Sequence, residues 1–242
     1  NGCNLLTVGG IYREQYQDWL SNDLILKVSD YRSTLVPSGD YFDIANDQGI
    51  KDMLGFTDVD GYRFRIGSDI DLIENPGLHI PYIGSVEFDG NNHTISNVDL
   101  TAHHFISNIG LIGCNQGGSI RNIRVDGNIT GEENIGGLVG YNRGMVSNCF
   151  SEMNVSGYSS VGGLLGYNNY ATISHCGSSG NVEGYQYVGG LVGDNHCKLY
   201  DCHTTVSVNG SLFVGGLVGI NDGPVSNCYT NGSVNGSRNV AG

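Results

Sequence analysis

A five-residue motif, Gly-Gly-Leu-Val-Gly, recurs along the second half of the chain at a nearly constant spacing. The four full copies begin at Gly136, Gly162, Gly189 and Gly215, with Leu in place of Val in the second. The second glycines of all copies, including weaker ones at Gly110 and Gly242, are 27, 26, 27, 26 and 26 residues apart. A fixed period in this range is typical of one small unit stacked on itself, so the sequence predicts a solenoid.

Two further positions recur in register with the motif. An asparagine follows it in five copies, at Asn115, Asn142, Asn168, Asn195 and Asn221. A cysteine comes later in four of them, at Cys149, Cys176, Cys202 and Cys228, with Ile123 in the earliest. Stacked coils place equivalent residues above one another, so we expect an asparagine ladder at a bend and an internal column of thiols.

The variation in repeat length has one location. The spacing from the asparagine to the Cys or Ile position is 8, 7, 8, 7 and 7 residues, whereas the next motif always begins 13 residues later. The extra residue is therefore expected in an outer turn directly after the asparagine.

The apolar residues indicate strands rather than helices. Ile123, Val125, Gly127 and Ile129 alternate with polar neighbours, the period-2 pattern of a strand. We therefore predict an all-β, right-handed, single-stranded parallel β-helix of about seven coils of 26–27 residues. Each coil would hold about three short strands, and coils would lie about 4.8 Å apart. The glycine pairs are expected at tight corners without room for a Cβ, and Gly or Asn where the backbone needs positive φ.

The N-terminal region has a different composition. Residues 1–100 contain 16 of the 24 acidic residues and six basic ones. Strands are expected at Tyr62–Ile66, Asp69–Leu72 and His93–Val98, and a short amphipathic helix at Asp47–Phe56. Residues 1–60 are predicted to form an N-terminal α/β cap that closes the stack, because an exposed row of strand edges invites pairing. The β-helix would span residues 61–242, with its last repeat truncated.

Few residues suggest catalysis or metal binding. The chain lacks His-Glu-X-X-His, and His103-His104 is interpreted as a surface loop. No metal site and no cofactor are expected. Asp69 and Asp71 share one face of a strand, and Asp89 could lie nearby, which resembles the carboxylates of glycan-cleaving enzymes. Turn and capping hydrogen bonds explain these three aspartates more simply.

Tyrosines supply the candidate binding residues. Tyr158 and Tyr185 occupy one position in adjacent repeats, with Tyr187 beside them, and Tyr141 and Tyr167 form a second such pair. Aromatic ladders of this kind could bind sugar rings or a protein partner, or they could simply pack rung on rung. A net charge of −13 disfavours nucleic acid as a partner, and no segment is expected to insert into a membrane.

The repeat unit, Gly-Gly-Leu-Val-Gly-Tyr/Asp-Asn followed by Val-Ser-Asn-Cys-Tyr/Phe, resembles the GLUG repeat of bacterial surface proteins. The segment from Asp69-Ile-Asp-Leu72 to Phe88-Asp-Gly-Asn-Asn also resembles the lead-in of that family. The resemblance implies secreted or surface-anchored proteins, including adhesins and the non-catalytic parts of IgA-specific metallopeptidases.

Together these observations predict a non-catalytic extracellular adhesin or structural module of a bacterial cell surface. It would bind a glycan or a host or cell-surface protein, or act as a stalk. One alternative is a polysaccharide-active β-helix lyase or hydrolase that uses the three aspartates. Another is a subunit of a self-assembling extracellular fibre formed by head-to-tail stacking, because the sequence stops inside a repeat.

Overall fold

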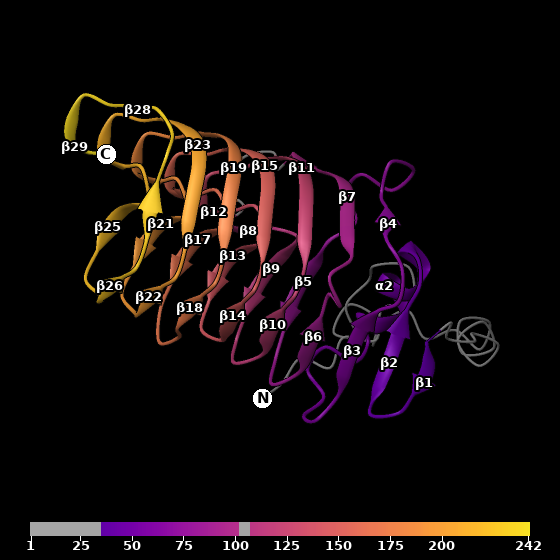
Figure 1. Ribbon diagram of the computed structural model, residues 1–242. Helices are drawn as coiled ribbons and strands as arrows, with labels where there is room; N and C mark the ends of the chain where they lie inside the picture. The colour runs from indigo at the N-terminus through magenta and orange to yellow at the C-terminus, as the bar shows by residue number, and fades with distance from the viewer. Residues whose placement is uncertain (1–34, 102–106) are drawn as a thin grey trace, which may run out of the picture.

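The computed structural model, which describes residues 35–101 and 107–242, is a parallel β-solenoid of about eight turns (Figure 1). The predicted all-β parallel β-helix is therefore confirmed. Each regular coil contributes four strands rather than the expected three, so four sheets run along the rod. The chain passes from sheet 1 to sheets 2, 3 and 4 and then back to sheet 1 one coil further on.

The four sheets differ in length and in how they begin. Only β1 and β2 pair in antiparallel fashion; the other strand pairs of the described residues are parallel. Sheet 1 contains, in spatial order, β1 (Val36–Ser38), β2 (Tyr41–Ile44), β3 (Arg63–Ile66), β6 (Glu87–Asp89), β10 (Ser119–Arg121), β14 (Met145–Ser147), β18 (Ile173–Ser174), β22 (Leu199–Tyr200) and β26 (Val225–Ser226). Sheet 2 contains β4 (Ile70–Asp71), β7 (Thr94–Thr101), β11 (Arg124–Thr130), β15 (Phe150–Ser156), β19 (Gly177–Glu183), β23 (His203–Asn209) and β27 (Tyr229–Thr230), with β28 (Val234–Asn235) also beside β23.

The two remaining sheets hold six strands each. Sheet 3 contains β8 (Ser107–Ile109), β12 (Glu133–Gly136), β16 (Ser159–Gly162), β20 (Gln186–Gly189), β24 (Leu212–Gly215) and β29 (Arg238–Ala241). Sheet 4 contains β5 (Ile80–Ile83), β9 (Ile112–Asn115), β13 (Val139–Asn142), β17 (Leu165–Asn168), β21 (Val192–Asn195) and β25 (Val218–Asn221). Inward-facing Ile, Val and Leu side chains of all four sheets form one continuous core.

The asparagine ladder forms as predicted. The side-chain amide of each asparagine donates to the side-chain oxygen of the next at 2.7–2.9 Å, from Asn115 through to Asn221. The same amide also closes the following turn by donating to a backbone carbonyl. That carbonyl is three residues on for Asn115 and Asn168 but two residues on for Asn142, Asn195 and Asn221. The 8-to-7 alternation therefore lies in this turn, as the sequence indicated.

The cysteine column also forms. Strand register places Cys149, Cys176, Cys202 and Cys228 on consecutive coils, and the Cys176 amide N–H donates to the Cys202 Sγ at 3.4 Å. The first three are buried and Cys228 is half-buried, and the six cysteines of the described residues are free thiols. Burial raises the pKa of the Cys176 thiol well above its usual value, so this column acts as apolar packing.

A left-handed residue explains the odd spacing before the cysteines. Val146 and Cys149 are three residues apart, yet both are buried. The residue directly before the Cys or Ile position has positive φ in all five repeats. This backbone conformation reverses the alternation of side chains between the two faces of the strand. These residues are Asn122, Asn148, His175, Asp201 and Asn227.

The motif glycines are required for close packing and not for positive φ. None of them is among the positive-φ glycines. A Cβ added at Gly137 would lie 2.1 Å from the Ser151 Oγ and 2.4 Å from the Gly163 carbonyl oxygen. The predicted lack of space is confirmed, and the positive-φ positions are held by other glycines such as Gly127 and Gly180, by Asn and by several larger residues.

The N-terminal end is closed by helix α2 (Asp47–Met53), which is shorter than the expected Asp47–Phe56 (Figure 1). Asn46 caps it, accepting from the Gly49 N–H at 3.0 Å, and its apolar residues Ile50 and Met53 join the core. The parallel sheet reaches further back than residue 61, because β2 pairs with β3. The rest of the expected cap, residues 1–34, and His103-His104 lie outside the described residues.

Candidate binding surface

The corner between sheets 2 and 3 carries the most exposed tyrosine pair. We call it the corner edge and define it as residues 131–134, 157–160, 184–187 and 210–213. Its backbone is fixed from coil to coil, because each corner carbonyl accepts two N–H groups from the next coil. The Tyr158 carbonyl accepts from Tyr185 and Gln186 at 3.0 Å each, and the Tyr185 carbonyl accepts from Ser211 and Leu212 at 3.1 and 2.9 Å.

Tyr158 and Tyr185 stack on each other at this corner. Their ring centroids are 4.9 Å apart and the ring planes differ by 11°. Their residues remain 54% and 43% exposed. The distance between the rings matches the spacing of adjacent coils, so the stack follows directly from strand register. The pair forms a ridge, since Glu132 precedes it and the short Ser211 follows it at the same position of the neighbouring coils.

A shallow hollow lies on each side of the tyrosine ridge. One, of about 340 Å³, is lined by Ser107, Glu132, Glu133, Tyr158, Ser159 and Gln186. The other, of about 350 Å³, is lined by Ser156, Gly157, Glu183, Gly184, Asn209, Gly210 and Ser211. Carboxylates, amides and hydroxyls therefore flank exposed aromatic rings on both sides. This combination suits a ligand that has apolar faces and hydrogen-bond donors.

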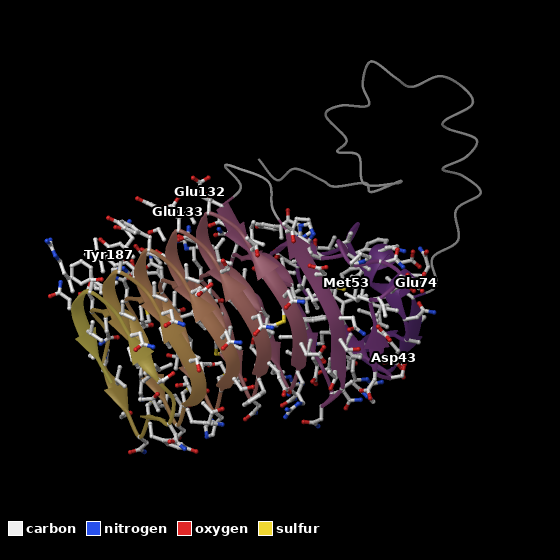
Figure 2. All side chains as sticks on the ribbon, turned by 90° about the horizontal axis from the view of Figure 1, so that it is seen from above. Asp43, Met53, Glu74, Glu132, Glu133 and Tyr187 are labelled. Carbon is white, nitrogen blue, oxygen red and sulfur yellow. The ribbon has the colours of Figure 1, made fainter. Side chains whose placement is uncertain are left out.

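Tyr187 is not part of that stack. Its ring contacts Phe213 of the next coil, with centroids 5.4 Å apart and planes tilted by 39°. Both residues are half-buried and lie on the corner edge. Figure 2 shows Tyr187 on the same long edge of the rod as Glu132 and Glu133. Phe213 occupies the position of Tyr187 one 26-residue repeat later. It was not predicted because the candidate binding residues were tyrosines alone.

The other predicted pair lies elsewhere. Tyr141 and Tyr167 stack at 5.2 Å with planes 7° apart, but they sit on sheet 4 and are half-buried. Burial and the nearby Asp194 carboxylate raise the pKa of Tyr167. The five predicted tyrosines therefore belong to two separate surfaces, and of these five only Tyr158 and Tyr185, on the corner edge, are strongly exposed.

A cluster beside Tyr167 was not expected from the sequence. His196 bridges two coils: its Nε2 lies 3.0 Å from Asp194 Oδ1 and its Nδ1 lies 3.0 Å from Asp222 Oδ2. Its ring also contacts Tyr167 at 5.3 Å. Desolvation raises the pKa of Asp194 above its usual value. The one sequence signal for this cluster is Asp194, which follows the third full glycine motif at the position that Tyr141 and Tyr167 occupy in the two copies before it.

The three aspartates of the enzyme hypothesis do not share partners. Asp69 accepts from the Thr94 N–H and faces His93 Nδ1, both at 3.0 Å, and Asp71 accepts from Asn97 at 2.8 Å. Asp89 belongs to sheet 1 and pairs with Arg121 at 2.8 Å. Hydrogen bonds from Thr94 and Asn97 lower the pKa values of Asp69 and Asp71. These contacts fit the capping interpretation.

The part of the chain that the structure describes shows neither a metal-binding cluster nor a membrane-spanning helix. Within residues 35–101 and 107–242, no group of three or more His, Cys, Asp or Glu side chains could hold a metal ion. No helix within these same ranges is long and apolar enough to cross a membrane.

Comparison with known proteins identifies the repeat. The family model of the GLUG motif matches residues 131–156 and 157–183, so the chain contains GLUG repeats, as the resemblance implied. The fold is similar to that of a crystal structure from Bacteroides ovatus described as a "putative immunoglobulin A1 protease". The two share 19% identity over 84% of each chain, with a TM-score of 0.58, so the likeness extends to the fold alone. No curated protein matches the sequence.

Proposed function

We propose that this chain is a non-catalytic module of a bacterial cell surface that binds an uncharged glycan at the corner edge. The observation that carries the proposal is the Tyr158–Tyr185 stack, which is exposed and lies between two polar hollows. The surface location rests on the GLUG repeats, which resemble those of bacterial adhesins.

The chemistry of the corner edge favours a sugar over other ligands. Sugar rings have apolar C–H faces that pack on aromatic rings, and hydroxyls that donate to carboxylates and amides. Glu132, Glu133 and Glu183 supply the acceptors around the ridge. These same carboxylates, and the net charge of −13, repel an anionic ligand such as a nucleic acid or an acidic polysaccharide.

The non-catalytic part of the proposal rests on the aspartates. A glycan hydrolase needs one carboxyl group that stays protonated near neutral pH. The hydrogen bonds at Asp69 and Asp71 act in the opposite direction, because they stabilise the ionised carboxylates.

Titration calorimetry with neutral hexasaccharides of β-glucan, chitin, xylan and mannan type tests the proposal. We expect at least one hexasaccharide to bind. The double substitution Tyr158→Ala and Tyr185→Ala should lower the affinity for it about 10-fold or more, because aromatic residues at the centre of an interface supply much of the binding energy. The matched control is Tyr141→Ala with Tyr167→Ala, which removes an equally stacked pair from sheet 4 and should leave affinity unchanged.

Two results would contradict the proposal. Equal loss of affinity in both double variants would mean that the corner edge is not the site. Binding confined to basic peptides, with affinity falling steeply as salt is added, would replace the glycan with a cationic protein partner.

A further inference from the structure

Sheet 3 has a backbone position that is left-handed in every coil, and four of its six occupants lie on the corner edge. Its φ lies between 52° and 62°, and its occupants are Asn108, Asn134, Ser160, Tyr187, Phe213 and Asn239. Asparagine is the ordinary choice here, because its short polar side chain tolerates this conformation and bonds locally. Asn134 shows this behaviour, since its amide donates to the Asn108 side chain at 2.9 Å. Tyr187 and Phe213, with φ of 54° and 55°, are the two bulky exceptions.

The two aromatic residues are not explained by folding. A large side chain with positive φ is energetically unfavourable, and nothing buries these rings fully in return. Tyr187 and Phe213 are half-buried and gain one tilted contact with each other, with centroids 5.4 Å apart. An asparagine pair would relieve the backbone strain and could make the hydrogen bond seen between Asn134 and Asn108. The left-handed backbone at these two positions favours asparagine, yet the sequence has Tyr and Phe there.

That disagreement falls beside the tyrosine ridge. Tyr187 is two residues after Tyr185 in the same coil, and Phe213 occupies the next coil. Gln186 separates Tyr185 from Tyr187 and lines the hollow that Tyr158 and Glu133 also line. The stacked pair Tyr158–Tyr185 and the tilted pair Tyr187–Phe213 thus span three consecutive coils, two coil spacings or about 10 Å along the rod.

We propose that Tyr187 and Phe213 form the second half of the binding surface and determine its preference for an oligosaccharide over a single sugar. This inference rests on the proposed function. One sugar ring contacts the Tyr158–Tyr185 ridge, and a following ring of the same chain contacts Tyr187 and Phe213. Strain at a position that folding does not require is typical of functional residues, where binding compensates for the lost stability.

The double substitution Tyr187→Asn and Phe213→Asn tests this assignment, because it should move stability and binding in opposite directions. We expect the melting midpoint to rise by about 2–4 °C as backbone strain is relieved. Affinity for the best neutral hexasaccharide should fall about 10-fold, whereas affinity for the matching monosaccharide, which contacts the Tyr158–Tyr185 ridge alone, should change less than about 2-fold. The control is Asn134→Tyr, which places a ring at the left-handed position of the coil that precedes the tyrosine ridge and should lower the midpoint.

Each other outcome separates this inference from the proposed function. If the double variant keeps the full hexasaccharide affinity while Tyr158→Ala with Tyr185→Ala loses it, the second half does not exist but the first stands. If the double variant melts lower and binds more weakly, Tyr187→Phe decides, since it keeps the ring: retained affinity supports the inference and lost affinity overturns it. Absence of any oligosaccharide binding by the unmodified chain overturns both proposals.

Discussion

The two stacked tyrosine pairs have nearly the same geometry but very different surroundings. Tyr158–Tyr185 and Tyr141–Tyr167 stack at 4.9 and 5.2 Å, each from adjacent coils. The first stands at a corner between two hollows, whereas the second lies on sheet 4, half-buried and directly before the buried asparagine ladder. Repeat register therefore creates the stack, but the position around the coil decides whether the rings support the fold or are available to a ligand.

The largest effect that would test this comparison is on the ladder beside the sheet 4 pair. Asn168 is fully buried, accepts from Asn142, and donates to Asn195 and to the Ala171 carbonyl. Replacing Asn168 with Ala leaves several buried polar groups without partners and should cost about 3 kcal/mol of unfolding free energy, measured by urea denaturation. The control is Asn154→Ala in the exposed ladder of Asn128, Asn154 and Asn181, where water replaces the lost bonds. Equal costs at both positions would contradict this expectation.

A smaller effect distinguishes the two tyrosine pairs directly. Tyr167 packs on both Tyr141 and the His196 ring, so Tyr167→Ala should cost about 2 kcal/mol of stability. Tyr185→Ala removes a more exposed ring and should cost less than about 1 kcal/mol while it weakens glycan binding. Thermal denaturation of both variants gives the comparison. A larger loss at Tyr185 would assign that ring to the fold.

The smallest effect is pH-dependent and concerns Asp194 next to Tyr167. Burial raises the pKa of Asp194, so the folded protein holds this proton more tightly than the unfolded chain does. Stability from this group is therefore complete below the usual value of 3.8 and is lost as pH rises through the folded pKa. Asp194→Asn should be more stable than the unmodified chain at pH 7 by less than about 1 kcal/mol, since the side chain is partly solvated and also loses its pairing with His196.

That difference should shrink as the pH falls below 3.8, when both chains carry an uncharged side chain here. Melting curves from pH 3 to pH 8 measure it. An advantage of the Asn variant that stayed constant with pH would show that Asp194 titrates alike in the folded and unfolded states.

Much of the fold could be predicted because the repeat specifies which residues are neighbours along the rod. The ladder from Asn115 to Asn221 and the cysteine column needed only the 26- and 27-residue steps. The angle around the coil was harder to predict. The position of a residue around the coil depends on left-handed residues at the corners. Tyr187 and Phe213 adopt this conformation although their residue types disfavour it. The pairing of Asp89 with Arg121 on sheet 1 was not predicted for the same reason.

The turn that follows each ladder asparagine has a practical consequence. One side-chain amide closes this turn at either of two lengths, while the strands before and after it keep their pairing. The solenoid therefore tolerates length change at this point of every coil, where the chain is outside the core and loop closure costs little. Foreign peptides grafted at several of these turns would be displayed as a row along one side of the rod, at intervals set by the coil spacing.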